Sequence, residues 1–243
     1  MKRILVIGGA NGMGLSIAKE LAAHDETEKV YIVDKAPLAE QYQEKKIESK
    51  MFDLTNVNYS LFDEYNDIDA LVITAGFGRL GLFEDIPEEM IKTYFDVNTI
   101  AVIRVIKRFY HKLLSKDNFY CAVLVSIAGF MSSPFFSIYG ATKAALKIFI
   151  ESVNVELVKS GTSNRILNVS PGNIEGTCFN QGKNDLNLTT PLAKKIIQNM
   201  REKNDLYIPD YIKIYKEVLE RYHKDFRSEG LHSYEYKLHS GRL

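Results

Sequence analysis

A phenol and an ammonium stand four positions apart in the segment SIYGATKAALKIF, residues 137–149, where Tyr139 precedes Lys143. Residues at this spacing share one face of a helix. A free tyrosine has a pKa of about 10 and is a poor base at neutral pH, whereas a nearby positive charge favours the phenolate. The pair could therefore act as a proton donor and acceptor.

The same Tyr-x-x-x-Lys spacing occurs twice more in the chain, so the pair alone is weak evidence. Ser126 lies thirteen residues before Tyr139, at the end of the apolar segment LVSIAG, and adds a hydroxyl group. The two competing tyrosines, Tyr31 and Tyr42, have no serine at that distance. The surroundings of Tyr139 therefore single it out as the candidate for chemistry.

The composition is that of an ordinary globular chain. Of the 243 residues, 46% are hydrophobic, and 31 Lys and Arg balance 31 Asp and Glu. A neutral balance gives no electrostatic reason to expect nucleic acid or an anionic membrane as a partner. No stretch approaches the roughly 20 apolar residues that span a bilayer, and the apolar run at the N-terminus is too short for a secretory signal. We expect neither a nucleic-acid nor a membrane partner.

The two cysteines, Cys121 and Cys178, lie far apart in the sequence and form no metal-ligand spacing. Thiols that stay unpaired are usual in a reducing compartment. They predict a cytoplasmic protein without a metal site.

Short apolar runs alternate with longer amphipathic stretches along most of the chain. The runs predict strands at residues 3–8, 29–34, 47–53, 69–76, 121–129 and 165–172. The amphipathic stretches predict helices at residues 13–24, 87–114, 139–159 and 190–202. The alternation implies right-handed βαβ units. We expect one α/β domain over residues 1–243, a Rossmann-type, doubly wound parallel sheet of about six to seven strands with helices on both faces.

Two segments break this rhythm. Residues 173–190 are polar and rich in Gly and Asn, and a loop of this length is usually functional or disordered. Pro209 and Asp210 begin a last predicted helix, over residues 210–226, whose charges alternate in sign as on a solvated face. Residues 232–243 alternate polar and apolar side chains and predict an edge strand.

A glycine-rich turn follows the first predicted strand, at the edge of the sheet where doubly wound folds bind ligands. It comprises Gly8, Gly9, Ala10, Asn11, Gly12, Met13 and Gly14, a G-x-x-x-G-x-G spacing. Glycines allow a tight turn and let the backbone approach a pyrophosphate, which the N–H groups and dipole of the next helix stabilise. The turn favours nucleotide binding over a glycine turn without a ligand.

The second predicted strand ends in Asp34, about 20 residues beyond the last of these glycines. A carboxylate in this place can accept hydrogen bonds from both hydroxyls of an adenosine ribose. It would also repel a 2′-phosphate, by roughly 4 kcal/mol for unit charges at about 4 Å and an effective dielectric of about 20. Asp34 favours NAD over NADP, although the adjacent Lys35 could partly accommodate a phosphate, and a turn-forming Asp is the alternative.

Further short motifs follow in order along the chain. They are Asp53-Leu54-Thr55, Thr74-Ala75-Gly76, Val97-Asn98 and Ser-Pro-Gly-Asn-Ile ending at Ile174. With the glycine turn, Asp34, Ser126 and the Tyr139/Lys143 pair, this ordered set resembles the short-chain dehydrogenase/reductase family, in its common single-domain branch. The resemblance covers residues 1 to about 178, roughly three quarters of the chain.

The resemblance implies a role for each matching residue. Tyr139 would be the general acid/base, and Lys143 would lower its pKa and hold the nicotinamide ribose. Ser126 would hydrogen-bond the substrate oxygen, and Asn98 would support a water-linked proton path to Lys143, unless Asn98 only satisfies backbone groups. The implied cofactor contacts are Gly8, Asn11, Gly12, Met13, Gly14, Asp34, Asp53, Leu54, Ala75, Gly76, Tyr139, Lys143, Pro171, Gly172 and Ile174.

The chain departs from the family pattern in several places. Ile7 stands where a Thr is usual, Thr74 stands where an Asn is usual, and the Thr expected after Pro171-Gly172 is shifted to Thr177. The resemblance marks residues 175–205 as the substrate-loop region. Residues 206–243 lack the usual glycine-rich last strand and form an atypical C-terminal helix and tail.

We expect an NAD(H)-dependent oxidoreductase that interconverts a secondary alcohol and a ketone. The substrate pocket would lie near Arg79, residues 127–133, Phe135, Phe136 and the 175–190 loop. The two phenylalanines suggest an apolar wall, whereas Arg79 fits a solvated loop better than an anionic substrate.

Two alternatives stay open. The chain could be a dinucleotide-binding sensor or scaffold without catalysis, although Ser126, Tyr139, Lys143 and Asn98 are all present. A sugar-nucleotide epimerase or dehydratase would need a third glycine where Leu15 stands. The resemblance also suggests a homodimer or homotetramer, formed through the long helices at 87–114 and 139–159.

Overall fold

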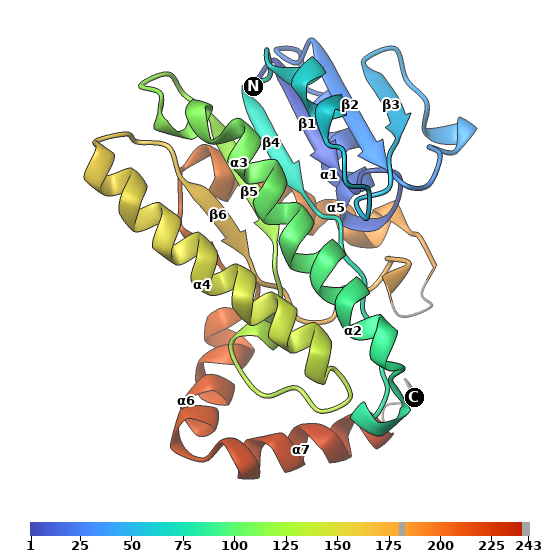
Figure 1. Cartoon of the computed structure of the whole chain (residues 1–243), viewed down its shortest axis with the longest axis vertical. Helices are drawn as coiled ribbons and strands as arrows, with labels where there is room; N and C mark the ends of the chain where they lie inside the picture. The colour runs from blue at the N-terminus through green and yellow to red at the C-terminus, as the bar shows by residue number, and fades with distance from the viewer. Residues whose placement is uncertain (180–182, 240–243) are drawn as a thin grey trace.

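The computed structural model describes residues 1–179 and 183–239 (Figure 1). Within these ranges, seven parallel strands form one sheet in the order β3-β2-β1-β4-β5-β6-β7. The strands are β1 (Arg3–Ile7), β2 (Lys29–Asp34), β3 (Ile47–Met51), β4 (Ala70–Ile73), β5 (Tyr120–Leu124), β6 (Ile166–Val169) and β7 (Leu206–Tyr207). This order confirms the predicted Rossmann-type α/β sheet.

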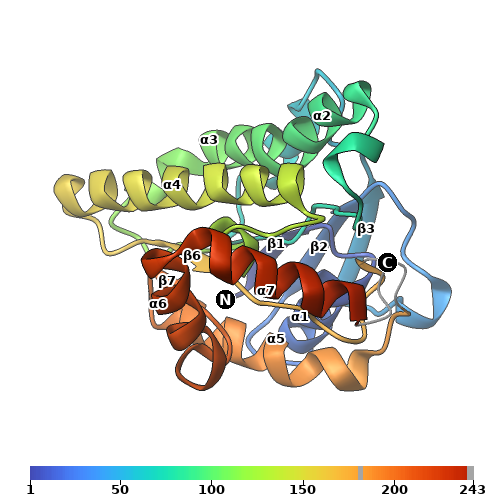
Figure 2. The same cartoon turned by 90° about the horizontal axis from the view of Figure 1, so that it is seen from below.

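Helices cover both faces of the sheet. They are α1 (Gly12–Ala22), α2 (Glu88–Phe95), α3 (Ala101–Leu114), α4 (Ser137–Ser160), α5 (Leu186–Arg201), α6 (Lys216–Lys224) and α7 (Phe226–His239). Figure 2 shows α3 and α4 on one face and α1 and α5 on the other. Short 3₁₀ turns lie at Glu40–Tyr42, Ser60–Tyr65, Phe83–Asp85 and Ile127–Gly129.

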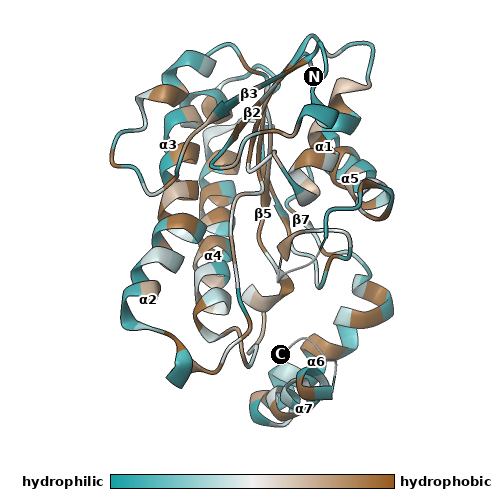
Figure 3. Cartoon of the chain, turned by 90° about the vertical axis from the view of Figure 1, so that its right-hand side faces the viewer, coloured by the Kyte–Doolittle hydropathy of each residue, from teal (hydrophilic) through white to brown (hydrophobic). Residues whose placement is uncertain are grey.

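The core forms two layers because successive side chains of a strand point to opposite faces. In β1, Leu5 and Ile7 pack toward α3 and α4, whereas Ile4 and Val6 pack toward α1 and α5. All four are almost completely buried, and each contributes roughly 2 kcal/mol of hydrophobic stabilisation. Burial on both faces explains why the central strands are mostly apolar, as the brown ribbons of Figure 3 show.

Two predicted helices differ in detail from those observed. The helix predicted over residues 87–114 contains a π-helical turn at Asp96–Ile100, between α2 and α3. Helix α5 begins at Leu186 rather than at 190, because the carboxylate of Asp185 accepts a hydrogen bond from the Asn187 N–H (2.9 Å) and caps it. The polar loop before α5 is therefore shorter than predicted.

The C-terminal tail departs most from the sequence prediction. A π-helical turn at Tyr211–Tyr215 leads into α6, where one helix was predicted over 210–226. The predicted edge strand at 232–243 is wrong as far as His239, because α7 continues to that residue, and residues 240–243 lie outside the described part. Helices α6 and α7 lie beyond the carboxyl ends of the strands (Figure 3).

The packing of α7 explains its helical form. Tyr234 and Lys237, three residues apart, both contact the loop before α4: the Tyr234 ring stacks on Phe135 at 4.6 Å, and Lys237 Nζ donates to the Pro134 carbonyl at 2.7 Å. A spacing of three places side chains on one face of a helix, whereas a strand would turn them to opposite sides. None of the helices described is long and apolar enough to cross a bilayer.

Candidate functional site

The glycine turn joins β1 to α1 at the carboxyl edge of the sheet. A Cβ on Gly14 would lie 2.2 Å from the Gly8 carbonyl oxygen and 2.4 Å from Thr74 Oγ1, so only glycine fits there. Asn11 is the exposed residue before the helix, with an extended backbone, and Met13 is buried beneath the turn. The N-terminus of α1 thus opens at the edge where the sequence predicted a phosphate site.

Asn184 occupies part of this helix terminus and was not foreseen from the sequence. The Gly12 N–H donates to Asn184 Oδ1 at 2.9 Å, and Asn184 Nδ2 donates to the Tyr42 hydroxyl at 3.4 Å. Thr177 lies beside it, 3.4 Å from the position of a Cβ on Gly12. The Asn184 carboxamide oxygen therefore accepts the hydrogen bond from the Gly12 N–H that a phosphate oxygen would otherwise accept. The sequence offered no signal for this contact, because it joins residues 172 positions apart.

Asp34 reaches the glycine turn from the end of β2. Its Oδ2 accepts from the Ala10 N–H and its Oδ1 from the Ala36 N–H, both at 3.0 Å. Asp53, after β3, accepts from the backbone N–H and the hydroxyl of Thr55, both at 2.8 Å, and these hydrogen bonds lower its pKa. Leu54 packs against the core. Asp34 is thus fixed beside the turn, while Asp53 and Leu54 form the next part of the same edge.

Ser126 and Tyr139 meet beyond the end of β5. Ser126 Oγ accepts from the Ala128 N–H at 3.1 Å, which caps the short turn after the strand. Tyr139 lies in the first turn of α4, and Ser126 is close enough to its hydroxyl to affect the pKa of the phenol. Burial raises the pKa of Tyr139 to about 12, and Ser126 acts in the opposite direction. The protein alone therefore does not make this phenol acidic, in contrast to the expectation from the Tyr/Lys spacing.

Lys143 is a buried ammonium one turn further along α4. Its side chain is 3% exposed, and its Nζ donates to the Leu124 carbonyl at 3.0 Å and lies 5.6 Å from the centroid of the Tyr139 ring. Burial lowers the pKa of Lys143 to about 8. Among the residues that the structure describes, Leu124 is its one hydrogen-bond partner, and no carboxylate shifts its pKa. Such a group has the capacity to bind further acceptors.

Asn98 lies in the π-helical turn between α2 and α3, a kind of turn that is frequent at functional sites. Its Oδ1 accepts from the Phe77 N–H (2.9 Å), and its Nδ2 donates to the Phe77 carbonyl (2.8 Å) and to Thr142 Oγ1 (3.3 Å). The amide therefore ties the loop after β4 to α4. This is the backbone-satisfying role, and it also fixes Asn98 close to Lys143.

The remaining predicted contacts surround the same place. A Cβ on Gly76 would lie 3.3 Å from both Asn98 Oδ1 and Lys143 Nζ, so these two groups meet at the end of β4. Ala75 N donates to the Ile7 carbonyl at 3.1 Å. On the other side, the Pro171 carbonyl accepts from the Ile127 N–H at 2.9 Å, and Ile174 packs against the core beside α1 and α5. Gly172 contacts the Tyr215 hydroxyl, from the tail.

The expected substrate wall divides into two parts. Phe136 contacts Tyr139, with ring centroids 5.3 Å apart, whereas Phe135 turns away and stacks on Tyr234 of α7. Arg79 is an exposed loop residue whose backbone N–H donates to the Tyr94 hydroxyl at 3.1 Å. The sequence predicted that the 175–190 loop borders this wall but did not single out Phe179, whose ring lies 5.4 Å from that of Tyr139. No periodic pattern marks it, because it belongs to a polar loop.

This set of groups fits a dinucleotide. The glycine turn and the α1 N-terminus suit a pyrophosphate, and the Asp34 carboxylate suits the hydroxyls of one ribose. The buried Lys143 ammonium, with one neutral acceptor, suits the hydroxyls of the other. Between these groups the phenol of Tyr139 and the hydroxyl of Ser126 can hold one oxygen atom and pass a proton to it.

Known proteins share this fold and sequence pattern. An uncharacterized oxidoreductase of Staphylococcus epidermidis is 26% identical over 195 residues, which cover 75% of this chain and 84% of that protein. The structure is similar to a short-chain dehydrogenase from Sphingobium yanoikuyae in complex with NADPH, with a TM-score of 0.75 and 21% identity over 94% of this chain and 96% of that one.

A second solved structure is an alcohol dehydrogenase from the archaeon Thermococcus sibiricus, complexed with 5-hydroxy-NADP. Its TM-score is 0.71, with 18% identity over 86% of this chain and 95% of that one. Residues 2–187 match the family model described as short chain dehydrogenase. The chain therefore belongs to the short-chain dehydrogenase/reductase family, as an NAD(P)-binding oxidoreductase.

Proposed function

We propose that this oxidoreductase interconverts a secondary alcohol and a ketone with NAD(H) as its cofactor. The observation that carries the proposal is the group of Tyr139, Ser126 and Lys143: a phenol beside a hydroxyl and beside a buried ammonium that has no carboxylate partner among the described residues. If Lys143 served only a structural ion pair, a carboxylate would lie beside its ammonium. An ammonium that lies near a phenol can instead stabilise the phenolate form of Tyr139.

In the proposed reaction, a bound nicotinamide would give a hydride to the carbonyl carbon of the ketone or take one from the carbinol carbon of the alcohol. Tyr139 donates its proton to the substrate oxygen as this oxygen gains negative charge, and Ser126 hydrogen-bonds the same oxygen. Lys143 stabilises the phenolate left on Tyr139, which is needed because burial raises the pKa of the phenol to about 12. Asn98 holds the loop after β4 against α4 and supports the path by which Lys143 and Tyr139 regain a proton.

The test is Tyr139→Phe, which removes the hydroxyl and keeps the ring. We expect turnover to fall at least about 100-fold, the low end of what general acid–base catalysis contributes, and binding of NADH to change by less than about threefold. The decrease in NADH absorbance with a panel of ketones and keto acids measures turnover, and calorimetry measures binding. Undiminished activity in this variant would end the proposed mechanism. A chain that binds NADH without turning over any carbonyl compound would support the sensor or scaffold alternative.

The preference for NAD over NADP is proposed from Asp34. Its carboxylate is held at the glycine turn by two backbone N–H groups, where it would repel a 2′-phosphate. The two solved neighbours described above were studied with NADP-type cofactors, but at 18% and 21% identity they share the fold alone. Asp34→Ala should narrow the ratio of kcat/KM for NADH over NADPH by about 10-fold or more. An unchanged ratio would refute this role.

We also propose that the protein is one domain that assembles as a homodimer or homotetramer in the cytoplasm. Large apolar side chains are exposed along α4, where Ile148, Val155 and Val158 are each more than half exposed. These exposed apolar side chains on α4 could be buried against a second copy of the chain. The cytoplasmic location is proposed from the cysteines, because both are free thiols, as is usual in a reducing compartment. Light scattering after size-exclusion chromatography tests the assembly, and Val155→Lys should shift it toward monomer.

A further inference from the structure

Three aromatic rings meet at the candidate catalytic phenol. The Tyr139 ring lies 5.3 Å from Phe136 and 5.4 Å from Phe179, and Phe136 and Phe179 lie 6.1 Å apart, all between centroids. These distances are typical of aromatic rings in contact. Tyr139 is 9% exposed, whereas Phe136 is partly exposed and Phe179 is 37% exposed, so the two phenylalanine rings border solvent. The phenol is therefore reached past two apolar rings.

The loop after β4 forms the third side of this place, and Gly78 is its contact. A Cβ on Gly78 would lie 2.7 Å from Phe179 Cζ and 2.9 Å from Tyr139 Cδ2. The Gly78 backbone therefore lies against both rings. Phe136, Phe179 and Gly78, three residues without a polar side-chain atom, surround this side of the Tyr139 ring.

Two ammonium groups lie near these rings, those of Lys143 and Lys237, and each donates hydrogen bonds to oxygen atoms of the protein. The pKa of Tyr139 is set by burial and by Ser126, and no charged side chain of the described residues contributes. Lys143 Nζ is turned to the Leu124 carbonyl, and Lys237 Nζ donates to Ser133 Oγ (2.9 Å) and to the Pro134 carbonyl (2.7 Å) while lying 5.5 Å from the Phe136 centroid. Arg79 is exposed. Because these two ammonium groups already donate to protein oxygens, a carboxylate attached to the reacting carbonyl would lose water against apolar rings, which is costly.

We propose that Phe179 and Phe136 form an apolar slot for the substituent of the carbonyl compound, so that the site takes flat apolar ketones, such as aryl ketones, in preference to anionic keto acids. The proposal rests on the proposed function, because it places the substrate oxygen between the Tyr139 and Ser126 hydroxyls. The groups attached to that carbonyl carbon then lie within a few ångströms of the rings that touch Tyr139. Phe179 is the specificity-determining residue of this slot, since it contacts both other rings and is the most exposed of the three.

The experiment measures binding without turnover. Tyr139→Phe keeps the rings, and in its NADH-loaded form calorimetry compares acetophenone with pyruvate. We expect acetophenone to bind at least about 10-fold more tightly, because a whole ring is transferred out of water. Adding Phe179→Ala should weaken acetophenone at least about 10-fold and pyruvate less than about twofold, and Phe179→Tyr should keep the binding. Phe83→Ala is the matched control, because Phe83 is a 64% exposed ring that should affect neither compound.

The outcomes separate the two claims. Tighter binding of pyruvate, or an equal loss of both compounds in Phe179→Ala, overturns the slot while leaving the proposed function standing if the wild type still oxidises NADH with keto acids. Loss of pyruvate binding in Arg79→Ala would then identify Arg79 as the group that binds an anion. Failure to bind NADH, or absence of turnover with every carbonyl compound, refutes the proposed function and the slot with it.

Discussion

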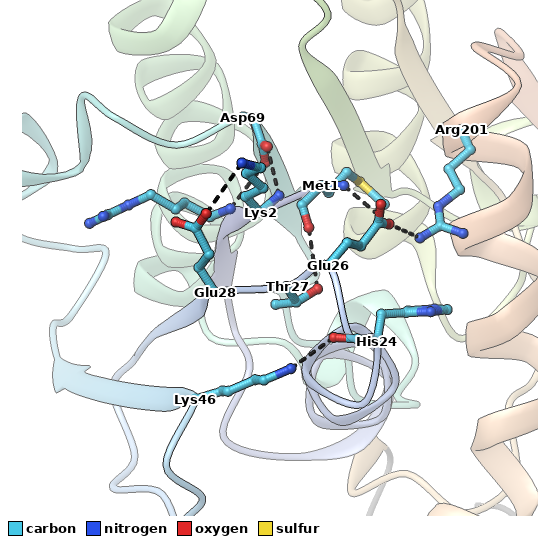
Figure 4. Close-up of polar contacts among 10 residues, drawn as sticks. Met1, Lys2, His24, Glu26, Thr27, Glu28, Lys46, Asp69 and Arg201 are labelled. Carbon is cyan, nitrogen blue, oxygen red and sulfur yellow. Dashed lines mark hydrogen bonds and ion pairs between the residues drawn. The ribbon is translucent and has the colours of Figure 1, made fainter.

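The charged groups at the two edges of the parallel sheet have different partners. At the amino edge, charged groups meet opposite charges at the surface, as Figure 4 shows. The Met1 ammonium lies 3.3 Å from Glu26, Arg201 lies 2.7 Å from the same carboxylate, and Lys2 lies 3.4 Å from Glu28. Glu26 is 54% exposed, and its hydrogen bond with the terminal ammonium, more than the charge of Arg201, lowers its pKa. Such pairs stabilise weakly.

At the carboxyl edge, an ammonium is buried with a neutral partner. Lys143 is almost inaccessible, its Nζ is bonded to the Leu124 carbonyl, and its pKa is lowered to about 8 by burial. This arrangement destabilises the fold, because the charged form has lost water without gaining an opposite charge. The surface pairs of the amino edge join opposite charges, whereas the charge proposed to serve the reaction is left with bonding capacity. Lys203, at the amino edge, is an exception, because its Nζ donates to the neutral oxygens of Phe119 and Asn164.

Lys143→Met gives the largest effect that this comparison predicts. We expect turnover to fall at least about 100-fold, because the phenolate of Tyr139 loses its stabilising charge. The free energy of unfolding at neutral pH should nevertheless rise. The lowering of the Lys143 pKa corresponds to about 3 kcal/mol, and losing the bond to Leu124 offsets about 1–2 kcal/mol of it. Urea denaturation measures the gain, and a loss of stability would show that the ammonium is structural.

The pH dependence of this gain sharpens the comparison. The pKa of Lys143 is about 8 in the folded chain and 10.5 as its ordinary value. Between these values the unfolded chain binds one proton more, so the stability of the wild type rises with pH. The advantage of Lys143→Met should therefore be full below pH 8 and shrink up to 10.5. Lys203, whose pKa is also about 8, is the same in both proteins and cancels from the difference. A constant difference across this range would contradict the lowered pKa.

The sequence predicts most of the sheet and the residues of the carboxyl edge. Five of the six longer strands are mostly apolar runs, whereas β3 (Ile47–Met51) is a largely exposed edge strand with polar residues. The glycine turn, Asp34, Ser126 and Lys143 follow from their spacing in the sequence. Their placement needs only the rule that parallel strands end at one edge. The two-residue strand β7, Leu206–Tyr207, is too short to carry a pattern.

Contacts between distant segments could not be predicted. The alternation around Tyr234 and Tyr236 resembles a strand, but the contacts of Tyr234 and Lys237 with the loop before α4 select a helix. Phe179 and Asn184 belong to a polar loop without periodicity, so only the fold places one at Tyr139 and the other at Gly12. Tertiary packing, rather than local propensity, sets the conformation and the contacts of these residues.

Asn184→Ala tests one of these unforeseen contacts and should have a moderate effect. The Asn184 oxygen accepts from the Gly12 N–H at the α1 terminus, which we assign to the cofactor phosphates. Removing that oxygen frees the N–H, so NADH should bind about two- to fivefold more tightly, in line with a net hydrogen-bond contribution of about 0.5–1 kcal/mol. Tyr42→Phe, which removes the other partner of Asn184, is the control and should change affinity less. Weaker binding in Asn184→Ala would mean that Asn184 contacts the cofactor rather than competing with it.

Arg201→Ala, at the amino edge, should have the smallest effect. Arg201 is 39% exposed and shares the Glu26 carboxylate with the Met1 ammonium, so one partner remains after the substitution. Exposed pairs contribute about 0–1 kcal/mol, and a change of 1 kcal/mol shifts the Tm of a chain of this size by about 2–4 °C. We therefore expect a Tm shift within about 2 °C that disappears at high salt, with turnover and NADH affinity unchanged. A large loss of stability, or any change in turnover, would break the division between a structural amino edge and a functional carboxyl edge. It would show that the paired surface charges of the amino edge, like the buried ammonium of Lys143, affect both the stability and the turnover of the protein.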